Sequence, residues 1–283
     1  MNWAGRGIRA VARVCLGSRY EESTQRYHRL RGRLARASVK LHPQRFADWR
    51  RLRPLRNAYA GRRCFVIGNG PSLNKTDITR LRDEVTIGCN GLFLLFDEMG
   101  FLPTFYTVED NLVGEDRSEE INAIRGTTKI FPRDLCEFLL PDEDTYYCHF
   151  ARGYPDFPRF SSRFAWIAYW GGTVTMMNLQ LAHYIGCREV YLVGIDHSYR
   201  VPKDVDIEGD RGLVITSDED DVNHFDPTYF GSGYRYHNPR VDIMEQGYRC
   251  AREFGERSGL SVMDATIDGH LNVFPKVNYD DLF

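Results

Sequence analysis

The glycine-rich segment Gly68-Asn69-Gly70-Pro71-Ser72 is the first place where residue types and spacing could do chemistry. Glycine lacks a Cβ, so it permits positive φ and lets the backbone approach a ligand closely. A helix beginning here would present free N–H groups to a phosphate, with Ser72 as its cap. A tight turn without a ligand is the alternative. The predicted phosphate-binding residues are Gly68, Asn69, Gly70 and Ser72.

Two other loop signatures do not fit this segment. It lacks the Gly-Lys-Ser/Thr lysine of ATPase phosphate loops. Leu73 stands where a Gly-x-Gly-x-x-Gly dinucleotide fingerprint has its third glycine. The segment therefore predicts nucleotide binding without assigning it to either class.

Polar side chains follow two more apolar runs and could contact the rest of a nucleotide. Asn90 offers both a donor and an acceptor to a base edge or a ribose. Asp110 offers a carboxylate that can hold a ribose hydroxyl or a metal. An Asx turn at Asn90 and a solvated loop at Asp110 are the alternatives.

A second glycine cluster, Gly171-Gly172-Thr173, opens a stretch with helical periodicity. Paired glycines and a threonine N-cap at a helix N-terminus are compatible with a second anion site. Ordinary helix capping would explain Thr173 alone. We include Gly171, Gly172 and Thr173 among the predicted nucleotide-binding residues.

Candidate acid–base groups lie in residues 194–199 and in the loop beyond them. Asp196 ends a strongly apolar run and is a further predicted nucleotide-binding residue. A histidine can take a proton from an attacking hydroxyl near pH 7, and a tyrosine can hydrogen-bond a departing phosphate oxygen. A lone histidine is usually structural, but His197, His224 and His237 fall in or beside one loop. The predicted catalytic residues are His224, Tyr199, Tyr229 and His197.

The elements that must position these groups alternate between short apolar strands and longer helical stretches. Strands are expected at residues 64–67, 85–89, 104–108, 128–131, 146–150, 189–196 and 260–263, and helices at 173–185 and 241–255. This alternation predicts an α/β, Rossmann-like fold with a mostly parallel sheet flanked by helices. Ligands of such sheets bind beyond the carboxyl ends of the strands, where the candidate residues fall. Residues 197–240, rich in Asp, Gly and Tyr, are predicted to form a lid.

Charge divides the chain into two regions. The net charge is −2, but residues 1–63 hold 17 Lys and Arg against three acidic residues, which gives +14 there and −16 in the remainder. We predict a basic, largely helical N-terminal arm at residues 1–60 and a nucleotide-binding catalytic domain at 61–283. The arm could contact the acidic body, an anionic membrane surface or nucleic acid. Because it lacks the signatures of nucleic-acid-binding modules, no nucleic-acid partner is predicted.

Cysteine usage and hydropathy indicate the compartment. The seven cysteines are scattered, without a Cys-x-x-Cys pair, which favours a reducing environment and argues against a zinc site. No apolar run approaches the roughly 20 residues of a membrane span, and no signal peptide is apparent. We expect a cytoplasmic protein, either free or peripheral on the inner membrane face, and an oligomer is compatible with the sequence.

Three segments resemble one superfamily: residues 65–73, Gly88-Cys89-Asn90 and residues 189–197. It contains the bacterial sialyltransferases of glycosyltransferase family 42 and the 6-hydroxymethylpterin diphosphokinase MptE-like proteins. The resemblance covers roughly residues 62–270 and implies a Rossmann-like sheet. In the sialyltransferase branch it also implies inverting, metal-independent transfer from a CMP-sugar. It implies that Asn69 and Asn90 contact the nucleotide and its phosphate, with Gly172 beside the sugar.

The chain departs from the sialyltransferase pattern at two places. Ser198 stands where those enzymes have a tyrosine, and Tyr199 follows one residue later. Ser232 stands where their catalytic histidine would be, so the base would be His224 or His237. The sequence is more similar to the MptE-like proteins, which share its Asp-His-Ser-Tyr and Asn-His-Phe segments.

Three functions follow from the sequence. The favoured one is a glycosyltransferase of surface glycan synthesis that needs no cofactor or metal and joins a CMP-sialic acid-like donor to a glycan acceptor. The alternative is a 6-hydroxymethylpterin diphosphokinase that uses ATP and Mg²⁺, with Asp110 and Asp196 as the available carboxylates. The third is an inactive binding protein, because a fold does not fix a function.

Overall fold

The computed structural model describes residues 42–200 and 214–283. The chain divides into two compact units, Met1–Ala47 and Asp48–Phe283. The helix α2 (Pro43–Leu52) runs across this boundary. The predicted N-terminal arm lies outside the described residues up to position 41, as do residues 201–213 of the predicted lid. Within the described ranges, no helix is long and apolar enough to cross a membrane.

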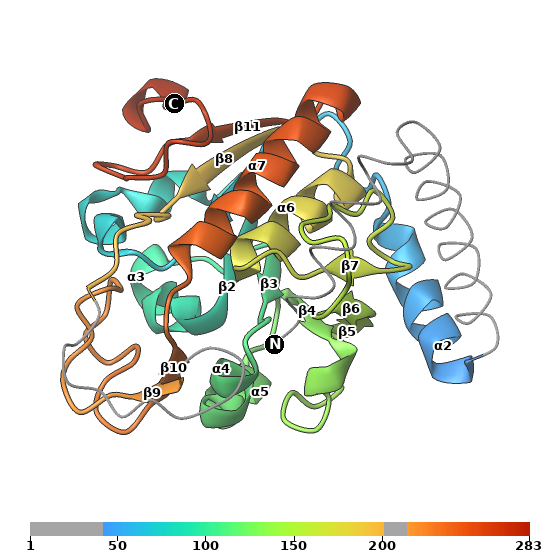
Figure 1. The fold of residues 1–283 in the computed structure, drawn as a ribbon, viewed down its shortest axis with the longest axis horizontal. Helices are drawn as coiled ribbons and strands as arrows, with labels where there is room; N and C mark the ends of the chain where they lie inside the picture. Colours follow the sequence, from blue (N-terminus) through green and yellow to red (C-terminus); the bar gives the residue numbers. More distant parts are fainter. Residues whose placement is uncertain (1–41, 201–213) are drawn as a thin grey trace, which may run out of the picture. The chain divides into compact units, whose positions relative to one another are not determined.

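Seven parallel strands form the central sheet of the second unit, which confirms the predicted α/β, Rossmann-like class (Figure 1). The strands are β1 (Cys64–Ile67), β2 (Val85–Cys89), β3 (Phe105–Thr107), β4 (Thr128–Pro132), β5 (Thr145–Cys148), β8 (Glu189–Val193) and β11 (Ser261–Asp264). Their order is β11-β8-β1-β2-β3-β4-β5. Since the chain proceeds from β1 toward one edge and later returns to the other side of β1, the order reverses between β1 and β8. Such a switch point is where open parallel sheets bind ligands.

The central strand β1 shows why these residues form a sheet covered on both faces. Cys64 and Val66 join one core cluster, and the alternate residues Phe65 and Ile67 join another. All four side chains are fully buried. A continuous apolar run of this kind is typical of a parallel strand with layers on both sides.

Two long helices, α6 (Val174–Ile185) and α7 (Val241–Ser258), cover the same face of the sheet (Figure 1). Thr173 caps α6 as predicted, because its side chain accepts a hydrogen bond from the Thr175 N–H. Gly186, with φ 103°, ends the helix in the left-handed conformation that glycine tolerates. The helix therefore begins just after Thr173, which lines the same pocket as Gly68 and Gly194, the residues that follow β1 and β8.

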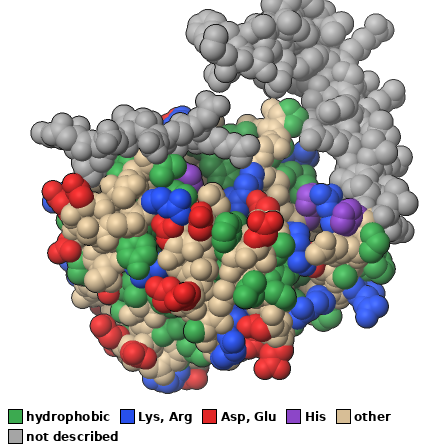
Figure 2. Space-filling view, turned by 90° about the horizontal axis from the view of Figure 1, so that it is seen from below, with side chains coloured by type: hydrophobic (Ala, Val, Ile, Leu, Met, Phe, Trp, Pro, Cys, Tyr) green, Lys and Arg blue, Asp and Glu red, His purple; other side chains and the backbone are tan. Residues whose placement is uncertain are grey.

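Shorter elements complete the unit. The helices are α3 (Phe96–Met99), α4 (Asn111–Asp116) and α5 (Ser118–Ala123). The 3₁₀ helices are η1 (Arg53–Leu55), η2 (Pro71–Lys75), η3 (Ile78–Leu81), η4 (Asn90–Leu95), η5 (Arg133–Leu135) and η6 (Asp280–Leu282). Two small sheets pair β6 (Phe150–Ala151) with β7 (Ala168–Tyr169), and β9 (Val214–Thr216) with β10 (Arg235–His237). On the face seen in Figure 2, basic and acidic side chains are interspersed among apolar ones.

Several sequence-based boundaries were wrong, and three of them lie in strands of the sheet. The strand expected at 189–196 ends at Val193, because Gly194 adopts φ 70° and turns the chain. The strand expected at 146–150 is divided between β5 and β6. The last strand runs from Ser261 to Asp264, one residue later than predicted.

Candidate functional site

A pocket opens at the switch point, where β1, β2 and β8 end and α6 begins. Its volume is about 120 Å³, several times what one water molecule requires. Ten of the fourteen predicted site residues line it: Gly68, Asn69, Gly70, Asn90, Thr173, Asp196, His197, Tyr199, His224 and Tyr229. Among the described residues, the lining contains no Lys or Arg. Ser72, Asp110, Gly171 and Gly172 are not part of the lining.

His224 is held by a buried carboxylate. Its Nδ1 lies 2.6 Å from Oδ2 of Asp221, whose side chain is 4% exposed. Burial by itself would raise the pKa of Asp221. Hydrogen bonds from His224 and from the N–H groups of Asn223 and Phe230 outweigh burial and lower that pKa. A charged Asp221 fixes the proton on Nδ1 of His224 and leaves Nε2 as the basic nitrogen.

Tyr229 supports the same histidine from its face. The two rings stack with centroids 3.9 Å apart and planes 2° from parallel. The Tyr229 hydroxyl accepts a 3.1 Å hydrogen bond from the Gly91 N–H, and burial raises the pKa of this phenol well above its ordinary value. Tyr229 therefore remains protonated at neutral pH and orients His224.

The glycine-rich turn is occupied by the protein's own groups. Gly68 donates its N–H to Val193 O, and Gly70 donates to Gly194 O. The Ser72 N–H and hydroxyl donate to the two carboxylate oxygens of Asp196, at 3.0 and 2.6 Å. The prediction that Ser72 caps a helix was wrong, because η2 begins at Pro71 with Gly70 as its N-cap residue, and no side chain caps it. Phosphate binding by this turn stays a prediction.

Close packing explains why the turn contains glycine. Gly70 has φ −71°, which any residue adopts, so the predicted need for positive φ does not arise here. A Cβ on Gly70 would instead lie 1.8 Å from Oδ2 of Asp196. The carboxylate of Asp196 thus sits where a side chain at position 70 would be.

Two asparagines leave acceptor atoms without partners. The side-chain Oδ1 atoms of Asn69 and Asn90 are buried and accept no hydrogen bond from the residues that the structure describes. Nδ2 of Asn69 makes only a 3.5 Å contact with Sγ of Cys89. Asn90 adopts φ 48° and accepts a hydrogen bond at its backbone oxygen from Tyr106. Because buried polar atoms are rarely left unpaired, both oxygens are positioned to accept hydrogen bonds from a ligand.

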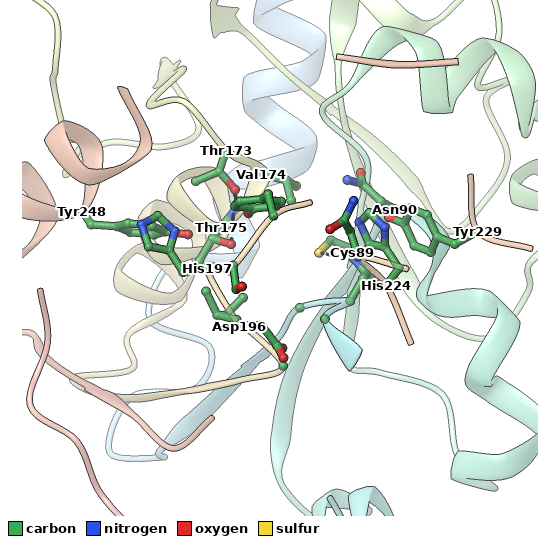
Figure 3. A pocket seen from close by; sticks show the side chains of 18 residues that line it. Cys89, Asn90, Thr173, Val174, Thr175, Asp196, His197, His224, Tyr229 and Tyr248 are labelled. Atoms are coloured by element: carbon green, nitrogen blue, oxygen red, sulfur yellow. Dashed lines mark hydrogen bonds between the residues drawn. The ribbon is translucent and has the colours of Figure 1, made fainter. Parts of the chain in front are cut away.

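His197 and Tyr248 lie on the opposite side of the pocket from His224 (Figure 3). Their rings pack edge-on, with centroids 5.8 Å apart. Neither nitrogen of His197 has a hydrogen-bond partner among the residues described, and burial lowers the pKa of this histidine. Tyr199 also lines the pocket, and burial, with a smaller contribution from Asp196, raises its pKa to about 12. Tyr199 is therefore a proton donor rather than an anion at neutral pH.

The remaining predicted residues have structural contacts. Asp110 caps α4 by accepting the Leu112 N–H at 2.8 Å, and its Oδ1 lies 3.5 Å from His237 Nε2. Gly172 has φ 94°, and a Cβ there would lie 2.9 Å from the backbone nitrogen of Met244 in α7. Packing of α6 against α7 thus accounts for this glycine.

Asp221 and Tyr248 are two of the residues at the site that sequence reasoning missed. Asp221 is three residues before His224, and this Asp-x-x-His spacing was the available signal. Tyr248 lies in α7, where the sequence predicts a tyrosine to be core. Its contribution to the pocket depends on how α7 packs, which the sequence does not show.

The carboxylates provide a poor Mg²⁺ site. Among the described residues, Asp196 is the one carboxylate in the lining, and Ser72 donates hydrogen bonds to both of its oxygens. Asp110 lies outside the lining and caps a helix. No group of three or more His, Cys, Asp or Glu is placed to hold a metal ion in residues 42–200 and 214–283. Mg²⁺ is usually held by one or two carboxylates plus substrate phosphates, so the protein would supply at most Asp196.

The fold and the pocket define an α/β protein with a candidate ligand pocket at the switch point of a parallel sheet. The chain belongs to the family described as "6-hydroxymethylpterin diphosphokinase MptE-like", which matches residues 42–202. No curated protein matches it. A solved structure, the MAf glycosyltransferase from Magnetospirillum magneticum AMB-1, is similar with 18% sequence identity and a TM-score of 0.49. The similarity covers 81% of this chain and 35% of that one, so this chain spans about a third of its length.

Proposed function

We propose that the chain is a transferase that moves a group from a nucleotide-activated donor to an acceptor hydroxyl. The observation that carries this proposal is the His224–Asp221 pair, 2.6 Å apart, in a pocket that also holds two unpartnered asparagine oxygens. A histidine oriented by a carboxylate is the usual arrangement of a general base, which contributes about 10²–10⁴-fold to a rate. The two asparagines could bind the donor and so hold it within reach of this base.

The proposed reaction is glycosyl transfer by in-line displacement. Nε2 of His224 accepts the proton of the acceptor hydroxyl, and the acceptor oxygen forms a bond to the anomeric carbon of the donor sugar. The bond from that carbon to the phosphate oxygen breaks, and the nucleotide leaves with the electron pair. The high pKa of Tyr199 keeps its O–H available to donate to the departing phosphate.

The donor's nucleoside is proposed to bind between β1 and β2. The Oδ1 atoms of Asn69 and Asn90 can accept hydrogen bonds from an exocyclic amine or a ribose hydroxyl. The start of α6, capped by Thr173, directs the positive end of a helix dipole toward the pocket and favours the phosphate there. A CMP-sialic acid-like donor, a glycan acceptor and a site of action on the inner membrane face complete the proposal.

A second candidate is a 6-hydroxymethylpterin diphosphokinase, which the family description favours. Here His224 would take the proton of the pterin's hydroxymethyl group, and that oxygen would displace AMP as it bonds to the β-phosphorus of ATP. Bound Mg²⁺ would neutralise phosphate charge, and Asp196 is the residue that could hold it. The shortage of carboxylates in the lining is why we place this function second.

A thermal-shift panel separates the candidates. CMP, CMP-sialic acid, UDP, GDP and ATP are each added with Mg²⁺ or with EDTA. A ligand at a hundred times its Kd stabilises the folded state by about 2.7 kcal/mol. An EDTA-resistant shift with CMP, together with release of CMP from CMP-sialic acid, supports the glycosyltransferase. A shift with ATP that requires Mg²⁺ supports the diphosphokinase, and no shift with any nucleotide would contradict both.

A further inference from the structure

The side of the pocket opposite His224 contains a second histidine, His197, whose ring nitrogens make no hydrogen bond within residues 42–200 and 214–283. His197 follows β8, and its side chain is 3% exposed. Its φ of 53° is left-handed, a strained conformation for a non-glycine residue that is concentrated at functional sites. Tyr248 and Tyr199 pack edge-on against the ring at 5.8 and 6.2 Å and fix its orientation.

The surroundings of this ring favour an uncharged ligand. Oε1 of Glu245 lies 3.7 Å from Nε2 of His197, too far for a hydrogen bond. Glu245 is outside the pocket lining, and its Oε2 is paired with Arg249 at 2.5 Å. An uncharged hydroxyl group can accept from the Nε2–H without bringing a second negative charge close to Glu245.

We infer that His197 is a specificity-determining residue that binds a hydroxyl group on a sugar ring of the substrate. The inference rests on the proposed function, because a nucleotide sugar carries such hydroxyls on both its ribose and its transferred sugar. Burial lowers the pKa of His197 and keeps the ring uncharged near neutral pH, which suits a hydroxyl better than an anion. The hydroxyl groups of Thr175 and Tyr248 lie on the same side of the pocket as His197 (Figure 3).

The test measures how binding depends on ligand hydroxyls in wild type and in His197→Phe, which removes both nitrogens and keeps a planar ring against Tyr248. The ligands are CMP, 2′,3′-dideoxy-CMP and CMP-sialic acid, measured by calorimetry. If the hydroxyl belongs to the ribose, dideoxy-CMP binds wild type about tenfold more weakly than CMP does, and His197→Phe does not distinguish the two. If it belongs to the transferred sugar, wild type prefers CMP-sialic acid to CMP by about tenfold, and the variant loses that preference.

Matched variants exclude a merely structural effect. His183→Phe is the control, because the Nδ1 of His183 is also buried without a partner, and its ring packs on Phe254 outside the lining. It should bind all three ligands as wild type does. His197→Asn accepts a left-handed φ and retains a donor and an acceptor, so it should restore part of the hydroxyl dependence. Nucleotide binding with equal hydroxyl dependence in wild type and His197→Phe would overturn this inference alone. Failure of wild type to bind any nucleotide would overturn the proposed function and this inference with it.

Discussion

Polar groups in the glycine-rich turn form hydrogen bonds within the protein, whereas several polar groups in the pocket walls are unpaired. In the turn, the N–H groups of Gly68, Gly70 and Ser72 all donate hydrogen bonds within the protein. The carboxylate of Asp196 accepts from Ser72, where a bound phosphate was predicted to accept. In the pocket walls, Asn69 Oδ1, Asn90 Oδ1 and both nitrogens of His197 have no hydrogen-bond partner in the described part of the chain.

This difference distinguishes residues that stabilise the fold from residues that could bind a ligand. A polar group with a hydrogen-bond partner in the protein contributes to stability, and removing it leaves that partner unpaired. A buried polar group left unsatisfied lowers stability, so such a group in a pocket marks a candidate contact for a ligand. Substitutions in the turn should therefore reduce the free energy of unfolding, and substitutions in the walls should reduce affinity. His224 combines both cases, since Asp221 satisfies Nδ1 and leaves Nε2 for chemistry.

The largest expected effect is on turnover by His224→Asn. Asparagine can still donate to Asp221, so the loop should stay folded while the base is lost. We expect the rate of sugar transfer, or of CMP release from CMP-sialic acid, to fall by about 10²–10⁴-fold with little change in melting temperature. The control is His237→Asn, which removes another histidine beside a carboxylate, Asp110, outside the pocket lining. Equal losses in both variants would contradict a specific role for His224.

The next largest effect should be on stability, in Gly70→Ala. The added Cβ would lie 1.8 Å from Oδ2 of Asp196, and overpacking of this kind costs about 1–3 kcal/mol. Urea unfolding measures the loss. Gly153→Ala is the matched control, because no atom lies within 4 Å of a Cβ built there. In an Asp196→Ala background the cost should shrink, and an unchanged cost would show that the turn is not packed around this carboxylate.

The same contrast shows how much could be predicted from sequence. Apolar runs such as residues 64–67 and 85–89 gave the strands and the parallel sheet, because burial on both faces leaves a continuous hydrophobic signal. Residues after strands β1, β2 and β8 reached one pocket, because parallel strands end at the same edge. The sequence could not show that Asp196 fills the glycine-rich turn, since that contact joins positions 124 residues apart.

Asn69→Ala should affect recognition rather than folding. The substitution removes an oxygen with no partner and a weak 3.5 Å contact to Cys89, so the free energy of unfolding should change little. Loss of one hydrogen bond to the nucleotide should weaken CMP binding by about tenfold. Calorimetry measures the affinity and urea unfolding the stability. A strongly destabilised variant that still bound CMP with wild-type affinity would show that the Asn69 side chain stabilises the fold and does not bind the nucleotide.

The smallest effect should be the pH dependence that Asp221 gives to stability. Hydrogen bonds from His224 and the loop lower its pKa despite burial, so the folded state favours the charged carboxylate. The resulting stabilisation is present above the unfolded pKa of about 3.9 and is lost as pH falls through the lower folded value. Asp221→Asn should therefore be less stable than wild type at pH 7, and the difference in unfolding free energy should narrow below about pH 4. The exposed neighbour Asp220 provides the control, since Asp220→Asn should track wild type at every pH. A gap between Asp221→Asn and wild type that stays constant from pH 7 to pH 3 would mean that the carboxylate's charge does not hold His224 in place.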